Sequence, residues 1–297
     1  MSIERHKTAR AVLLAVLIIA AVGLFWPRGY EGIAKSEFWA RKKLWRRCFD
    51  TVVAGDSRAY HSLFPTEMAP LARGRTIGNF GFAGCAIEKR YLDAVDQVLD
   101  LRPGRERTVI LAITPHSLTR LAHQSNGFLE LNRVNRLELL ALSRLGGIRD
   151  LGDPITADDV KNQIRGVRYI QTLKPDGSIA AYKTPENPKE ALSEYRARLE
   201  TTELRPESLQ ELSSAIQAWT ARGVRVVGFR PPTTTAMVEL EEQLLPYPPV
   251  PQLFQSAGGQ WLEIPPAAYP TYDGSHLRFD GAARFSQDFA RMLWPSR

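Results

Sequence analysis

A serine, an aspartate and a histidine in this sequence have the types and spacing that nucleophilic acyl chemistry needs. Ser57 follows Gly55-Asp56 directly after an apolar, β-branched run, and Asp273 and His276 lie three residues apart on a short glycine-containing stretch. A carboxylate at that spacing can hydrogen-bond to the imidazole, fix its tautomer and orient it toward a serine proton. We therefore predict that Ser57 is a nucleophile, His276 its general base and Asp273 the residue that orients the histidine.

A glycine-rich stretch between these segments could supply backbone N–H groups to a developing oxyanion. It reads Asn79-Phe80-Gly81-Phe82-Ala83-Gly84. Glycine lets a backbone N–H approach a ligand closely, as oxyanion stabilisation requires. We expect Gly81 to contribute such a donor, together with the backbone of Ser57.

The elements that would position these residues alternate between apolar strands and amphipathic helices. Strand, helix and strand in succession indicate parallel crossovers, and near-continuous apolar strands indicate burial on both faces. We predict an α/β fold, three-layer α/β/α, with a central parallel sheet in which the first three strands are adjacent and Ser57 lies at the carboxyl edge. The predicted strands are Thr51–Ala54, Thr108–Ile113, Val224–Phe229 and Gln260–Ile264, and the predicted helices are Tyr91–Leu101, Pro206–Ala221 and Asp280–Leu293.

Residues 120–200 interrupt this alternation. They contain a helical stretch, Leu129–Leu145, and two short strand-like runs, Arg168–Thr172 and Ser178–Lys183, around the turn sequence Lys174-Pro175-Asp176-Gly177. That turn predicts a β-hairpin. We expect an insertion over the functional edge of the sheet rather than a second domain.

In order and position these segments resemble the SGNH (GDSL-like) hydrolase superfamily over residues 50–297. Gly55-Asp56-Ser57 corresponds to the nucleophile block, Asn79-x-Gly81-x-x-Gly84 to the glycine block and Asp273-x-x-His276-Leu to the final block. The resemblance implies a flavodoxin-like α/β/α catalytic domain that uses Ser57 for acyl transfer and needs no metal or other cofactor.

One block departs from the family pattern. Many members carry Gly-x-Asn-Asp where this chain reads Ala112-Ile113-Thr114-Pro115-His116, so the resemblance implies that Thr114 replaces the asparagine oxyanion donor or that the donor lies elsewhere. The missing asparagine, the N-terminal apolar run and the insertion make the chain similar to the branch that contains alginate O-acetyltransferases and the protein of teichoic-acid D-alanylation. Members of that branch act with a membrane-bound O-acyltransferase on extracytoplasmic polymers.

Several polar residues near the predicted strand ends are candidates for substrate binding. Arg58 and Arg230 could bind an anionic sugar, or each could form a structural ion pair. Asn79 and His116 are further candidates, and His116, like His61, could line a cleft or simply be solvated.

The N-terminus has the composition of a membrane-attachment region. Residues 11–26 form an uncharged apolar run after Arg5, Lys7 and Arg10, which predicts a signal anchor within residues 1–28, with a cleaved signal peptide as the alternative. Residues 29–49 are basic and carry Phe38 and Trp45. This pattern predicts an amphipathic helix on the membrane surface or against a membrane partner, unless it is a solvated linker.

Charge and cysteine content exclude two other classes of protein. Residues 1–50 hold 10 Lys+Arg and 4 Asp+Glu, which leaves 29 and 28 for residues 51–297, so the folded part lacks the excess basic charge of a nucleic-acid-binding domain. Cys48 and Cys85 do not have the spacing of a zinc site.

Two hypotheses of different classes follow. As an enzyme, the protein would be an O-acyltransferase or esterase that moves an acyl group, with acetyl expected, to or from an extracytoplasmic polysaccharide through an acyl-Ser57 intermediate. Hydrolysis and transfer share that intermediate, so the sequence does not separate them. As a non-enzyme, it would be a glycan-binding or scaffolding partner of a membrane-bound O-acyltransferase. In both cases the resemblance implies a single-pass inner-membrane protein with a periplasmic domain.

Overall fold

The computed structural model describes most of the chain after the N-terminal apolar run. The described residues are 14, 30–100, 102, 104–151, 153, 156–245 and 248–295. The predicted anchor, residues 1–28, lies outside them apart from Leu14. Over the ranges that are described, no helix combines the length and apolar character needed to cross a bilayer.

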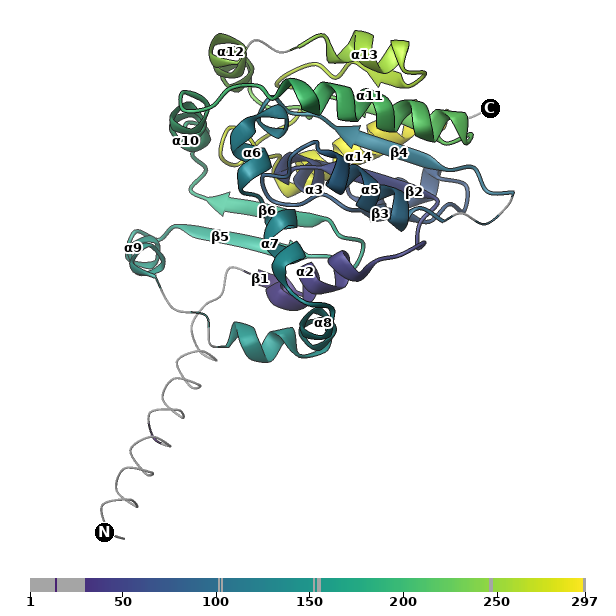
Figure 1. The fold of residues 1–297 in the computed structure, drawn as a ribbon. Helices are drawn as coiled ribbons and strands as arrows, with labels where there is room; N and C mark the ends of the chain where they lie inside the picture. Colours follow the sequence, from purple (N-terminus) through teal and green to yellow (C-terminus); the bar gives the residue numbers. More distant parts are fainter. Residues whose placement is uncertain are drawn as a thin grey trace.

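A parallel sheet of five strands forms the centre of the molecule (Figure 1). Its order is β3 (Ile77–Asn79), β2 (Thr51–Gly55), β4 (Thr108–Ala112), β7 (Arg225–Phe229) and β8 (Gln260–Leu262). The first three of the predicted strands, now β2, β4 and β7, are adjacent and parallel, with Gly55 level with Ala112 and Ala112 level with Phe229. The prediction of a parallel α/β fold is therefore confirmed. The edge strand β3 was not predicted, because three residues are too few to show a periodicity.

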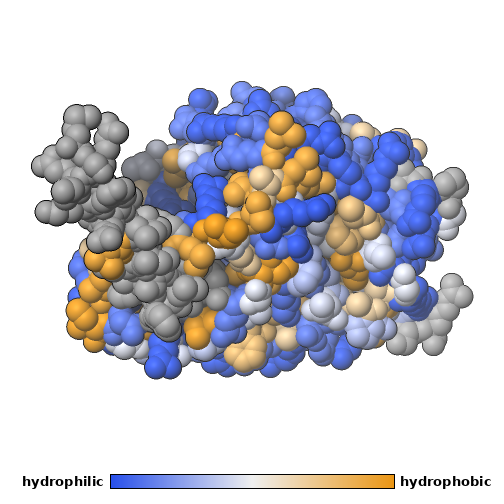
Figure 2. Space-filling view, turned by 90° about the horizontal axis from the view of Figure 1, so that it is seen from below, coloured by the Kyte–Doolittle hydropathy of each residue, from blue (hydrophilic) through white to orange (hydrophobic). Residues whose placement is uncertain are grey.

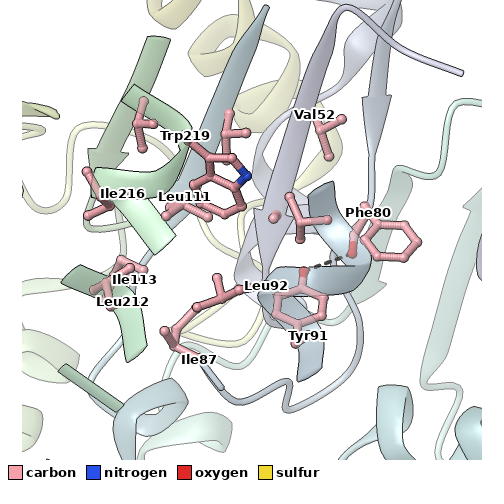
Figure 3. Packing of buried hydrophobic residues seen from close by; sticks show 14 of the residues in the cluster. Val52, Phe80, Ile87, Tyr91, Leu92, Leu111, Ile113, Leu212, Ile216 and Trp219 are labelled. Atoms are coloured by element: carbon pink, nitrogen blue, oxygen red, sulfur yellow. Dashed lines mark hydrogen bonds between the residues drawn. The ribbon is translucent and has the colours of Figure 1, made fainter. Parts of the chain in front are cut away.

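Helices cover both faces of this sheet, and alternate residues of each strand point to opposite faces. Val52 and Leu111 pack with α5 (Lys89–Val98), α11 (Pro206–Ala221) and α13 (Val250–Ser256) (Figure 3). Val53 and Ile110 pack on the other face with α3 (Ser57–Ser62), α4 (Pro65–Met68) and α14 (Phe279–Leu293). Burial of both faces explains the continuous apolar strands of the sequence.

A buried tyrosine fixes the end of β2 immediately before the candidate nucleophile. Tyr91 on α5 accepts a hydrogen bond of 2.8 Å from the Gly55 N–H and donates one of 2.9 Å to the Phe80 carbonyl (Figure 3). Its hydroxyl thus satisfies two backbone groups that the sheet leaves unpaired. The consequence is a fixed position for the chain at Gly55, two residues before Ser57.

A small second sheet consists of β1 (Tyr30–Gly32), β5 (Arg168–Leu173) and β6 (Ile179–Thr184). The predicted hairpin is confirmed, since β5 and β6 are antiparallel around the predicted turn. The turn is anchored to the main sheet, because the Asn79 N–H donates to the Asp176 carbonyl at 2.8 Å. The insertion therefore lies against the sheet edge that carries Asn79.

The predicted helix Leu129–Leu145 is two helices, α7 (Gly127–Arg133) and α8 (Arg136–Asp150). Asn135 separates them, because its side chain accepts a hydrogen bond of 2.9 Å from the Glu138 N–H and so caps α8. The remaining helices are α2 (Lys35–Leu44), α6 (Arg120–Gln124), α9 (Ala157–Ile164), α10 (Glu190–Leu199) and α12 (Thr235–Leu244).

The basic segment 29–49 does contain a helix, α2, but its aromatic face does not lie on a membrane. Phe38 is buried, and Trp39 packs against Phe82 of the main core. On its other side α2 packs against α8, where the Asp150 carboxylate accepts a hydrogen bond of 3.1 Å from the Ser36 N–H. The expectation of a membrane-facing aromatic surface here is wrong, because the insertion and the domain core cover it.

Gly146 lets α2 and α8 approach closely, and it provides a test of this packing. A Cβ atom at Gly146 would lie 2.3 Å from the Glu37 backbone nitrogen, whereas one at Gly147 would meet only the Ala34 Cβ, at 3.5 Å. We predict that Gly146→Ala lowers the free energy of unfolding by about 1–3 kcal/mol. Gly147→Ala should leave it unchanged or raise it by up to about 1 kcal/mol, because alanine favours helix. Denaturant unfolding measures both, and equal effects would contradict the close helix contact.

Candidate active site

The structure brings Ser57, His276 and Asp273 together, as the spacing of the sequence predicts. The Ser57 Oγ lies 2.8 Å from the His276 Nε2, and the His276 Nδ1 lies 2.7 Å from the Asp273 Oδ2. With the proton of the ring on Nδ1, the histidine donates to the carboxylate and accepts from the serine hydroxyl. This is the arrangement in which an imidazole removes a serine proton.

The Asp273–His276 loop is held in a tight turn by hydrogen bonds from its backbone to the Asp273 carboxylate. The second carboxylate oxygen of Asp273 accepts hydrogen bonds from the N–H groups of Ser275, at 2.8 Å, and His276, at 2.7 Å. Gly274 has a φ of +91°, and a Cβ there would lie 1.9 Å from the Pro188 carbonyl oxygen. The turn therefore requires glycine.

Electrostatics keep Asp273 ionised. Burial alone would raise the pKa of this carboxyl, but the His276 ring and the hydrogen bonds from His276 and Ser275 outweigh it and lower the pKa below the ordinary value. Asp273 therefore remains a carboxylate that can stabilise an imidazolium at His276.

Two aromatic side chains surround the histidine. The Tyr272 ring stacks on His276 with centroids 5.8 Å apart and planes 14° from parallel. The His61 ring lies 5.1 Å from it, and the His61 Nδ1 lies 2.9 Å from the Ile179 carbonyl. Burial and, to a smaller extent, the charge of His276 lower the pKa of His61 to about 3. His61 therefore remains neutral and does not repel a charged His276. Neither contact was predicted, because both depend on the position of the β5–β6 hairpin and the final loop.

Two of the three predicted oxyanion donors are engaged elsewhere. The Gly81 N–H donates to the Asn79 Oδ1 at 3.0 Å. The Thr114 hydroxyl is fully buried and donates to the Asp56 Oδ2 at 2.5 Å. Gly81 and Thr114 are therefore corrected to structural residues that hold the loops beside the nucleophile.

The backbone N–H of Ser57 remains available. Ser57 is the first residue of α3, and its N–H has no hydrogen-bond acceptor among the residues that the structure describes. The N–H groups of Ala83 and Gly84 likewise have none within those ranges. Their loop passes the nucleophile turn, because the adjacent Phe82 N–H donates to the Gly55 carbonyl at 3.1 Å. We infer that a second N–H donor to an oxyanion comes from this loop at Ala83 or Gly84 and not from Gly81.

Arg58 and Arg230 form structural ion pairs, the second of the two possibilities that the sequence left open for them. Arg58 lies 2.7 Å from the Glu241 Oε1, Arg230 lies 3.0 Å from its Oε2, and the Glu241 side chain is fully buried. The Arg58 Nε also donates to the Ser275 Oγ at 2.9 Å. The residue after the nucleophile is thereby tied to the loop that carries His276. Glu241 was missed because its helix, α12, was not predicted.

The other two substrate candidates are also largely internal. The Asn79 Nδ2 donates to the carbonyls of Ala59 and Leu63, each at 2.9 Å, and so joins β3 to α3. His116 is 6% exposed and lies beside the glycine loop, where a Cβ at Gly84 would be 3.7 Å from its Cε1. His116 therefore borders a loop next to the site but is itself largely buried.

Comparison with known proteins gives little beyond these observations. No family model matches the chain, and no curated protein does. Among solved structures, an acetyl xylan esterase (Est2A) from the rumen bacterium Butyrivibrio proteoclasticus is similar at 10% identity and a TM-score of 0.31. The match covers 82% of this chain but 63% of that one, less than two thirds of its length. At this level of similarity the chemistry has to be inferred from the site geometry.

The buried ion pairs predict that substitutions of two neighbouring glutamates lower the free energy of unfolding by different amounts. Glu241→Gln should lower the free energy of unfolding by about 3–5 kcal/mol, because Arg58 then loses its buried partner. Glu242→Gln should cost less than about 1 kcal/mol, since the Glu242 side chain is 54% exposed. Chemical denaturation measures both variants, and a cost below about 1 kcal/mol for Glu241→Gln would contradict the bracing role of this residue.

The lowered pKa of Asp273 predicts a dependence of stability on pH. Because the folded pKa lies below the ordinary value of 3.8, the unfolded chain takes up this proton first as the pH falls. The stabilisation by Asp273 is therefore complete well above pH 3.8 and is lost below it. We predict that the difference in unfolding free energy between wild type and Asp273→Asn narrows by about 1 kcal/mol between pH 6 and pH 3. A difference that stays constant over this range would show that the carboxylate is not stabilised.

Proposed function

We propose that this protein is a serine-dependent O-acyl esterase or O-acyltransferase. The observation that carries the proposal is the continuous hydrogen-bonded series from the Ser57 Oγ through the His276 ring to the Asp273 carboxylate. Such a series needs three residues from two distant parts of the chain in one geometry, and a purely structural role does not require that order of donors and acceptors.

The proposed reaction begins with attack of the Ser57 Oγ on an ester carbonyl carbon, while the His276 Nε2 accepts the serine proton. The carbonyl oxygen becomes an oxyanion that the Ser57 N–H can stabilise. Collapse of this intermediate breaks the ester bond, and His276 returns its proton to the departing alcohol. Asp273 stabilises the imidazolium between these two steps. Attack by water on the acyl-serine then gives hydrolysis, and attack by a sugar hydroxyl gives transfer.

The substrate class and the location are finer parts of the proposal. Acetyl as the acyl group and an extracytoplasmic polysaccharide as donor or acceptor follow from the sequence resemblance to membrane-anchored SGNH proteins. The uncharged run at residues 11–26 supports attachment to the inner membrane, and the periplasmic side of the domain follows from the resemblance. A membrane-bound O-acyltransferase is the proposed partner, and nucleic acid is not.

One observation favours a second candidate, a glycan-binding or scaffolding partner of such an acyltransferase. Thr114, which by the resemblance would replace the family asparagine, is fully buried, and its hydroxyl donates to Asp56. Loss of one oxyanion donor costs about 3–4 kcal/mol of transition-state stabilisation. A protein with the triad but a weak oxyanion site could then bind its substrate without rapid turnover.

Covalent labelling separates the two candidates. We predict that a fluorophosphonate probe labels the full chain in detergent at Ser57, and that Ser57→Ala and His276→Ala abolish labelling. The exposed Ser193, whose hydroxyl donates to the Glu190 carbonyl, provides the control variant Ser193→Ala, which should label like the wild type.

Hydrolysis of 4-nitrophenyl acetate by the same variants measures turnover. We expect Ser57→Ala to lower kcat/KM by about 10³-fold or more relative to Ser193→Ala. Equal labelling of wild type and Ser57→Ala would contradict the nucleophile assignment. Labelling of Ser57 without measurable turnover would favour the scaffolding candidate.

A further inference from the structure

Helix α8 has an apolar side that the described protein does not cover. Leu137, Leu140, Leu145 and Ile148 are 79%, 43%, 58% and 68% exposed. With 3.6 residues per turn these positions fall on one side of the helix. The opposite side, with Leu139, Ser143, Gly146 and Asp150, is buried and faces α2.

Helix α9 also carries exposed apolar side chains. Val160 and Ile164 are 41% and 80% exposed, one turn apart on α9. Seen from below, the side on which α8 lies in Figure 1, hydrophobic residues gather between hydrophilic ones (Figure 2). Contiguous exposed apolar side chains on a folded domain mark an interaction surface.

Basic residues accompany the apolar ones on α8. Arg136, Arg144 and Arg149 are exposed, and Glu138 is the one exposed acidic residue of the helix. By the helical repeat, Arg136 and Arg149 border the apolar side, and Arg144 lies within it. Arginines combined with exposed apolar side chains on one helix are typical of a segment that lies in the headgroup region of a bilayer, where the apolar side chains enter the acyl boundary and the arginines meet phosphate groups.

The position of α8 in the fold points to the same occupant. Its last residue, Asp150, binds the Ser36 N–H at the start of α2, and β1 begins only six residues earlier, at Tyr30. The uncharged run of the sequence ends at Trp26, four residues before β1. The exposed side of α8 thus lies close to where the chain leaves its proposed membrane segment.

We propose that the exposed side of α8 lies on the phospholipid surface next to the N-terminal anchor. This proposal rests on the proposed membrane attachment. It transfers the membrane-contacting role from α2, where the sequence placed it, to the helix that covers α2. The contact would hold the domain in one orientation on the bilayer instead of letting it move freely on its anchor.

Fluorescence quenching by lipid tests this orientation in the full chain. In a Cys48→Ser background, which removes the exposed native cysteine and leaves the buried Cys85, the variant Leu145→Cys carries an environment-sensitive fluorophore. Met292→Cys on α14 is the control, because this residue is likewise exposed, at 41%, but belongs to a helix packed on the main sheet. Both proteins are reconstituted into phosphatidylcholine–phosphatidylglycerol vesicles at low protein density, with and without lipids that carry a shallow doxyl quencher.

We expect the doxyl lipid to lower the fluorescence at position 145 at least twofold and to leave position 292 unchanged. Accessibility of position 145 to aqueous iodide without doxyl quenching would overturn the proposal. Shielding of position 145 that depends on protein density and not on doxyl lipid would also overturn it and would indicate a second copy of the chain as occupant. Failure of the full chain to enter vesicles would overturn it together with membrane attachment. Turnover of 4-nitrophenyl acetate by the same samples reports on Ser57 separately, so that failure of the proposed chemistry is distinguishable.

Discussion

The turn between β2 and α3 is the constraint on which the rest of the site depends. Gly55 has a φ of +148°, and a Cβ there would lie 2.6 Å from the Ala112 carbonyl oxygen, so the chain can reverse next to β4 only at a glycine. The Asp56 carboxylate then caps α3 by accepting from the Arg58 N–H at 3.0 Å, while its other oxygen accepts from Thr114. Ser57 is thereby held as the first residue of a helix, with a backbone N–H that has no acceptor in the described part of the chain and with its hydroxyl directed to His276.

A buried ion pair connects the loop that carries His276 to this turn. Arg58 joins Glu241 on α12 to Ser275 on the final loop. Taking an ion pair out of water costs free energy, so such a pair contributes more to a defined geometry than to stability. We interpret the Arg58–Glu241 contact as the interaction that keeps the His276 loop in register with Ser57.

One of the basic residues among the first fifty is buried inside the fold, which a charge count does not reveal. Lys42 on α2 is 1% exposed, and its Nζ donates to the Gly177 carbonyl at 2.7 Å. The rings of Phe38, Trp39, Tyr60 and Phe82 surround this amine at 5.2–5.3 Å. Burial lowers the pKa of Lys42 well below its ordinary value. This lysine joins α2 to the hairpin turn, so part of the basic segment serves packing rather than a membrane surface.

The sequence by itself determined the features that are local or periodic. Continuous apolar runs identified β2, β4 and β7, the helical spacing of apolar residues identified α11 with its observed bounds, and the turn sequence at residues 174–177 identified the β5–β6 hairpin. The pairing of Asp273 with His276 was also predictable, because residues three apart on a tight turn have little freedom to separate. Only the tertiary structure decided which polar groups are available. Arg58, Arg230, Asn79 and Thr114 are the right residue types for a site, but each has its partner in another part of the fold. The Gly81 N–H is bonded to Asn79, two residues away, because of the path that the glycine loop takes. A side chain's chemistry is fixed by its type, whereas its availability depends on the neighbours that long-range packing brings to it, and no local spacing encodes those neighbours.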